Sequence, residues 1–115
     1  MNDAVDHAVR IKNVGKTEVI NLTYTYSTLG PRTTPRLGVA GDSVTKPMPI
    51  PDHIDVEWVT ETDGLHHEAH VPFSSKISAS EVAGHTVSIE IDGASLKVFI
   101  VKRLPGFREE KRLLD

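Results

Sequence analysis

The sequence of 115 residues contains no cysteine. That absence excludes disulfides, thiol catalysis and thiolate metal ligands, but it leaves the cellular compartment open. No apolar run reaches the ~18 residues of a membrane-spanning helix, so no spanning segment is expected. Aromatic residues make up only 5% of the chain, and the formal net charge is −3. With no basic field and no aromatic stacking surface, we expect neither a nucleic-acid partner nor attraction to anionic lipid.

The start of the chain bears on its compartment. Residues 1–6 are polar and acidic, unlike the basic and then apolar opening of a signal peptide. Two interpretations stay open: a cytoplasmic protein, or an exported one whose signal has been removed. The length fits a single domain, residues 1–115, that can bury roughly two thirds of its unfolded surface.

Valine, isoleucine and threonine alternate with polar residues along most of the chain. Successive side chains of a strand face opposite ways, so this alternation predicts strands. Residues 7–12 place Val9 and Ile11 on one face, and residues 18–26 form a second half-buried strand with Ile20 on its apolar face. Ser78 to Glu81 has the spacing of a capping box, which predicts a single helical turn ending at Gly84.

Two Asp-Gly pairs lie between alternating runs, the strongest short-range signal of a β-hairpin. Taking Asp63-Gly64 and Asp92-Gly93 as the two-residue turns predicts the cross-strand neighbours. The first register pairs Trp58 with Ala69, Val56 with Val71, Thr60 with His67, Val59 with Glu68, Glu57 with His70 and Glu61 with His66. The second pairs Ile89 with Leu96, Val87 with Val98 and Ser88 with Lys97.

Residues 27–53 contain five of the seven prolines and lack a sustained period. Proline denies a ladder donor, so we expect a long irregular loop with at most a short edge strand over 36–44. Residues 108–112 are a charge run, expected to be frayed or a short terminal helix. About six or seven strands with at most one helical turn predict an all-β fold, an antiparallel β-sandwich.

Residues 65–70 resemble a zinc-protease motif, but the second histidine would fall at position 71, which is Val71. On a strand, several outer-face side chains could still suit zinc. The expected set is Glu57, Glu61, His66, Glu68 and His70. Cross-strand charge pairing, worth ~0.2–1 kcal/mol per pair, explains the same pattern. We therefore expect no metal and no cofactor. No nucleophile elbow or phosphate-binding glycine loop is present, so we expect no enzyme.

Four segments together carry a family resemblance: residues 49–58, 63–66, 71–72 and 87–100. They hold a proline-containing lead-in, a Val-x-Trp strand, an Asp-Gly turn, a Val-Pro exit and a last hairpin. This pattern resembles small bacterial, often lipid-anchored proteins encoded beside secreted phospholipase toxins of type VI secretion. The resemblance implies a non-enzymatic immunity protein that blocks a toxin in the periplasm. The lipid-attachment cysteine of that family is absent, so a lipid anchor is implied only if it was removed with the signal.

The leading hypothesis is thus a periplasmic immunity protein that binds and inhibits a cognate lipase effector. Its expected contact surface is the 27–53 loop, with charged donors and apolar anchors. The candidate contact residues are Arg32, Arg36, Leu37, Lys46 and Met48. Two alternatives stay open. One is a metal-binding or hydrolytic β-domain using His66, Glu68 and His70. The other is a structural module of a surface or secretion assembly that pairs through an exposed strand edge.

Overall fold

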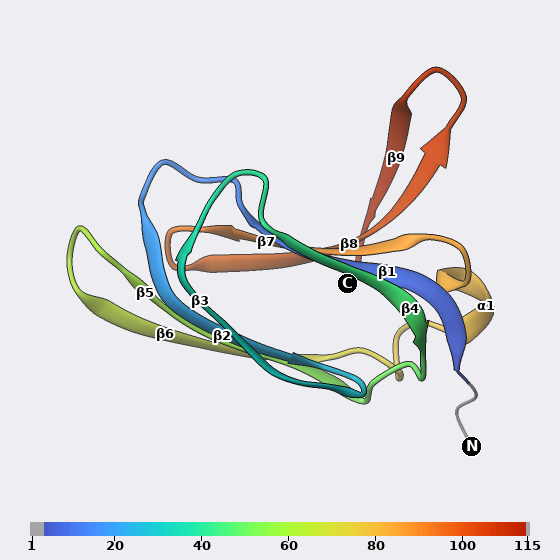
Figure 1. Cartoon of the computed structure of the whole chain (residues 1–115), viewed down its shortest axis with the longest axis horizontal. Coiled ribbons are helices and arrows are strands. Elements are labelled where there is room, and N and C mark those ends of the chain that lie inside the picture. The colour runs from blue at the N-terminus through green and yellow to red at the C-terminus, as the bar shows by residue number, and fades with distance from the viewer. Residues whose placement is uncertain (1–3, 115) are drawn as a thin grey trace.

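The computed structural model describes residues 4–114. Residues 1–3, part of the polar start that was compared with a signal peptide, lie outside the described residues. Within the described residues, nine strands and one helical turn follow in order (Figure 1). They are β1 Val5–Asn13, β2 Val19–Tyr26, β3 Leu29–Leu37, β4 Asp42–Met48, β5 His53–Thr60, β6 Leu65–Pro72, α1 Ala79–Val82, β7 Thr86–Asp92, β8 Ser95–Leu104 and β9 Arg108–Leu113.

The strands form two sheets that face each other (Figure 1). The five-stranded sheet has the order β4-β1-β7-β8-β9, and the four-stranded sheet has the order β3-β2-β5-β6. Among the strands of the described residues, β1 and β7 run parallel and the other neighbouring strands are antiparallel. The predicted all-β sandwich is confirmed, with more strands than the six or seven expected.

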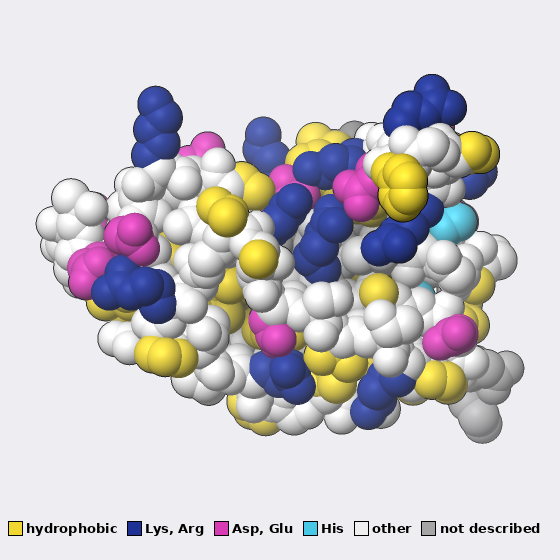
Figure 2. Space-filling model, turned by 45° about the horizontal axis from the view of Figure 1, so that its top comes forward, with side chains coloured by type: hydrophobic (Ala, Val, Ile, Leu, Met, Phe, Trp, Pro, Cys, Tyr) yellow, Lys and Arg dark blue, Asp and Glu magenta, His cyan; other side chains and the backbone are white. Residues whose placement is uncertain are grey.

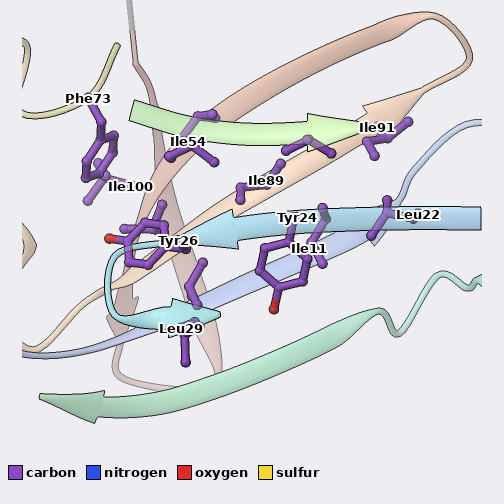
Figure 3. Close-up of a cluster of buried hydrophobic side chains, with 14 of the residues drawn as sticks. Ile11, Leu22, Tyr24, Tyr26, Leu29, Ile54, Phe73, Ile89, Ile91 and Ile100 are labelled. Atoms are coloured by element: carbon purple, nitrogen blue, oxygen red, sulfur yellow. The ribbon is translucent and has the colours of Figure 1, made fainter. Parts of the chain in front are cut away.

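The core lies between the sheets, where both contribute branched and aromatic side chains (Figure 3). Ile11 and Ile89 of the five-stranded sheet are fully buried, as is Leu22 of the other. Trp58 is 1% exposed, and its indole Nε1 donates to the Gly93 carbonyl at 2.9 Å. This bond joins β5 to the β7–β8 turn, so one side chain fills the core and also ties the sheets together.

Both hairpins place their residues on the predicted faces, but their registers differ from the prediction by two positions. Trp58 lies opposite His67, not Ala69, and Ile89 lies opposite Val98, not Leu96. In the first hairpin the connection is four residues long, 61–64, and is closed by a bond from Gly64 N to the Thr60 carbonyl. A shift of two preserves the side-chain faces because the period of a strand is two.

The remaining pairs predicted for these hairpins shift in the same way, except that Glu61, predicted opposite His66, lies in the connection and outside the β5–β6 ladder. Val56 pairs with Ala69, Thr60 with Leu65, Val59 with His66, Glu57 with Glu68, Val87 with Ile100 and Ser88 with Phe99. The second hairpin turns at residues 93–94, one position beyond the predicted turn.

The prediction of a long irregular loop over 27–53 is wrong. This segment contains β3 and β4, which lie at the edges of different sheets. Their prolines are compatible with strands because an edge strand leaves half of its backbone groups unpaired. The predicted strand over 36–44 is also wrong in its bounds, since residues 38–41 are the connection by which the chain crosses from one sheet to the other.

Three further elements can be compared with the prediction: the charge run at 108–112, strand β2 and the helical turn. The charge run at 108–112 is neither frayed nor helical but belongs to β9, which pairs with β8. Strand β2 carries an irregularity at Asn21, whose φ is 49°, so Ile20 is only half-buried and Val19 takes the core position. The helical turn α1 is confirmed, with Glu81 accepting a bond from the Ser78 backbone N–H. Among residues 4–114 no helix is long and apolar enough to cross a membrane.

Candidate functional site

A cleft of about 500 Å³ lies between β3 and the start of β4. It exists because the 38–41 connection carries the chain from one sheet to the other, so β3 and β4 border the same opening. Gly41 sits at its edge with φ of 70°, and an added Cβ would lie 2.0 Å from the Ile11 carbonyl oxygen. Only glycine fits this close approach of two backbones. Three of the predicted contact residues, Arg32, Arg36 and Leu37, line the cleft.

Asp42 organises one wall of the cleft. Arg32 donates from Nε to Asp42 Oδ2 at 2.9 Å, and the Tyr24 hydroxyl donates to the same oxygen at 3.0 Å. The Arg32 hydrogen bonds hold the pKa of the Asp42 carboxyl below its ordinary value. Burial, with the Asp42 bond, raises the pKa of Tyr24 to about 12. At neutral pH the wall is therefore an anionic carboxylate held between a guanidinium and a neutral phenol.

Arg36 forms a second charged group at the cleft. Its Nη1 lies 2.8 Å from Glu61 Oε2 and 3.0 Å from Glu18 Oε2, and its Nη2 bonds Glu61 again at 3.0 Å. Hydrogen bonds to Glu61 and Glu18 raise the pKa of Arg36, and the hydrogen bonds from Arg36 lower the pKa of Glu61. Half of the Arg36 side chain is still exposed, so a partner's acidic group can approach it.

The two predicted apolar anchors are buried, and Lys46 lies outside the cleft. Leu37 and Met48 are core residues, 2% and 0% exposed, so neither can anchor a partner from the surface. Both lie at the ends of strands in a segment without a sustained period, so the sequence pattern did not indicate that they are buried. Lys46 is exposed on β4, an edge strand of the five-stranded sheet, and is not part of the lining of the cleft.

The outer face of β5 and β6 carries the histidines that the sequence singled out. Glu57, His66 and Glu68 each offer one ligand atom, and these atoms lie within 4.8 Å of one another. His66 Nε2 is 3.2 Å from Glu57 Oε2. All three side chains are more than half exposed. The group could take a divalent cation, yet it is equally an exposed cross-strand ion pair.

His70 does not join this group. It contacts Asp55, its direct partner across the ladder, and its ring stacks on His53 at 4.1 Å between centroids. The side chain of Glu57, predicted to lie opposite His70, contacts His66 instead, and the side chain of Glu61, predicted to lie opposite His66, accepts hydrogen bonds from Arg36. The inner-face histidine, His67, contacts the Thr60 hydroxyl at 3.0 Å.

A buried polar network on the outer face of the five-stranded sheet was missed. Glu90 is 7% exposed, and its Oε2 accepts from Ser88 at 3.0 Å and lies 2.6 Å from Lys111 Nζ. Burial would raise the pKa of Glu90, but the bonds from Lys111 and Ser88 outweigh it and lower the pKa. Arg10 donates to Ser88 at 3.0 Å and joins the network. Strand β7 alternates polar residues with Val87, Ile89 and Ile91, which is the pattern of a solvent-exposed outer face, so the sequence pattern did not indicate that Glu90 is buried.

Comparisons with known proteins add little to this geometry. No protein-family model matches the chain, and no curated protein matches it. Among solved structures, the chain is similar to the NMR structure of a protein from Eubacterium rectale, with a TM-score of 0.48 and 24% sequence identity. That match covers 83% of this chain and 87% of the other. A likeness at this level carries no argument about function.

Proposed function

We propose that this chain is a non-enzymatic immunity protein that binds a cognate secreted toxin, a lipase effector of type VI secretion, and occludes it. The observation that carries the proposal is the β3–β4 cleft. It presents two arginines, Arg32 and Arg36, whose side chains are 41% and 52% exposed while carboxylates hold them in place. Guanidinium groups held in one orientation lose little entropy on binding, which favours contacts with acidic groups of a protein.

The sequence resemblance supplies the kind of partner. It implies a periplasmic location, and a lipid anchor only where one preceded the present start. Neutralising a toxin at low abundance needs nanomolar affinity, about −12 kcal/mol. A standard interface buries roughly 800 Å² on each partner, more than the cleft alone offers. The cleft is therefore expected to be the centre of a larger contact that includes the neighbouring surface of β3 and β4.

The test is direct binding between the purified chain and the lipase encoded beside it. The double variant Arg32→Gln, Arg36→Gln removes both charges without placing a carboxylate against Asp42. It should weaken binding by at least tenfold and restore lipase activity. The matched control is Arg112→Gln, because Arg112 is also an exposed arginine paired with a carboxylate, Glu81, at 3.1 Å. Equal loss of binding in the control and the double variant would move the contact off the cleft.

A second candidate function rests on the cluster of Glu57, His66 and Glu68. Carboxylate and imidazole ligands suit zinc, and a site with three protein ligands leaves a fourth position for water. In this alternative the chain is a metal-dependent hydrolytic domain. Zinc bound at one equivalent, together with hydrolysis of a lipase substrate by the chain alone, would favour it over the immunity proposal.

A further inference from the structure

The hairpin of β8 and β9 extends beyond the sandwich as an arm (Figure 1). We define the arm as residues 102–112, with residues 105–107 as its tip. Leu104 pairs with Arg108 at the end of the ladder, which leaves a three-residue connection. Residues on both sides of the arm are exposed except Leu104, which is half-buried.

The arm differs in charge from the rest of the chain. It carries five Lys and Arg residues against two Glu, a net charge of +3. The other 104 residues carry eight Lys and Arg against fourteen Asp and Glu, a net charge of −6. Figure 2 shows Lys and Arg side chains gathered around protruding hydrophobic groups toward its upper right. The formal net charge of −3 led us to expect no attraction to anionic lipid. That value is the sum of a basic arm and an acidic remainder of the chain.

The tip presents an aromatic ring. Phe107 is 106% exposed, the most exposed of the large apolar side chains among the described residues. Its φ is 61°, a left-handed conformation that is a genuine outlier for a bulky residue. Such strain persists where the surroundings enforce it and is found at functional positions. The backbone is fixed in part by Arg108, whose Nε donates to the Pro105 carbonyl at 3.2 Å.

The cations next to the tip are available to a partner. Among the described residues, Lys102, Arg103 and Arg108 form no salt bridge. One of the two acidic residues of the arm, Glu109, lies 3.4 Å from the Arg10 guanidinium and is partly neutralised. Arg103, Arg108 and Phe107 all border one hollow of about 430 Å³, which Glu109 also lines. An aromatic ring and two guanidinium groups therefore meet in one place.

We propose that the arm docks the protein on anionic membrane surfaces, with Phe107 entering the interface and Arg103 and Arg108 pairing with lipid phosphates. A bilayer surface accepts a single protruding ring flanked by cations, and each cation near an anionic leaflet strengthens the attraction. A stable protein interface needs roughly 800 Å² per partner, which a three-residue tip with one apolar side chain cannot supply. The contact is peripheral and reversible. It is independent of toxin binding.

The test is cosedimentation with vesicles. Phosphatidylcholine vesicles containing one third phosphatidylglycerol should bind the protein, and phosphatidylcholine alone should not. Raising the salt concentration should weaken the binding because it screens the charges. Arg103→Gln combined with Arg108→Gln should weaken it about thirty-fold, since two charges at about 1 kcal/mol each are lost. Phe107→Asn should weaken it about tenfold.

Asparagine is the chosen replacement at position 107 because it tolerates the left-handed backbone, so the arm keeps its shape. Its melting temperature is compared with that of the wild type. The matched control is Val39→Asn, which removes an apolar side chain 79% exposed in the 38–41 connection and should bind vesicles normally. Wild-type protein that ignores the mixed vesicles, or Phe107→Asn protein that binds them as well as wild type, would overturn the inference. Arm-dependent binding to the purified lipase without vesicle binding would also overturn it. Toxin neutralisation can succeed or fail in either case.

Discussion

Truncation of Trp58 to alanine tests the packing of the sandwich. The side chain is 1% exposed and fills the space between β5 and the β7–β8 turn. Removing a buried tryptophan costs about 3–5 kcal/mol. The variant also leaves the Gly93 carbonyl without its indole donor. A domain of this size has only about 5–15 kcal/mol of stability, so the loss is a large fraction of the total.

In a thermal melt, 1 kcal/mol corresponds to roughly 4 °C for a chain of this length. We therefore expect Trp58→Ala to melt about 12–20 °C below wild type. Trp58→Phe keeps much of the apolar burial and loses the bond to Gly93, so its loss should be smaller, about 1–3 kcal/mol.

Circular dichroism is the right probe, because Trp58 is the chain's single tryptophan and its fluorescence disappears in both variants. The control is Val39→Ala, which removes methyl groups from an exposed side chain and should change stability by less than about 0.5 kcal/mol. If Trp58→Ala melts within the range of Val39→Ala, the side chain does not hold the two sheets together as described.

Two other predictions concern charge and metal. Because Arg32 lowers the folded-state pKa of Asp42, the carboxylate contributes stability that is present above its ordinary pKa and is lost as pH falls through the lowered value. Asp42→Asn should thus be less stable than wild type at pH 7 in urea unfolding, with a gap that narrows below about pH 4; a gap independent of pH would contradict this. Protein purified without added metal should carry no stoichiometric zinc by elemental analysis, because the cluster is exposed and, among the described residues, no group outside it hydrogen-bonds the His66 imidazole to hold its orientation. Zinc at one equivalent, lost in His66→Ala, would contradict that expectation.

Alternation predicted the faces of the hairpin strands but not their registers. Trp58 and Ile89 face the core as predicted, because apolar and polar residues alternate with a period of two in these strands. The registers depend on where each turn closes. The glycines Gly64 and Gly93 take positive φ, at 68° and 60°, but the aspartate before each does not. An Asp-Gly pair therefore marks the neighbourhood of a turn without fixing its two central residues.

Edge strands were the main failure of the sequence-based prediction. Prolines in β3 and β4 and dense charge in β9 all argue against strands when judged locally. These features are tolerated because one side of each strand has no neighbour in its sheet, and only the three-dimensional order of strands reveals that. Because of the same strand order, Leu37 and Met48, which were predicted to be surface anchors, lie in the core.

The candidate cleft could be predicted only in part. Arg32 and Arg36 were selected as exposed guanidinium groups in an irregular, proline-rich segment, and both line the cleft. Their partners could not be foreseen. Asp42 meets Arg32 because the chain crosses between sheets at 38–41. Glu61, directly after β5, meets Arg36 of β3 across the intervening strand β2. Contacts of this kind arise from tertiary structure and leave no periodic signal in the sequence.

The most direct test of the central claim is survival of cells that express the neighbouring lipase in the periplasm. The proposed function predicts that cells producing this chain in the same compartment survive, and that cells producing the Arg32→Gln, Arg36→Gln variant at equal abundance die. Survival with both proteins would keep the immunity proposal and place the contact outside the cleft. Cells that die equally with and without the wild-type chain would contradict the immunity proposal itself.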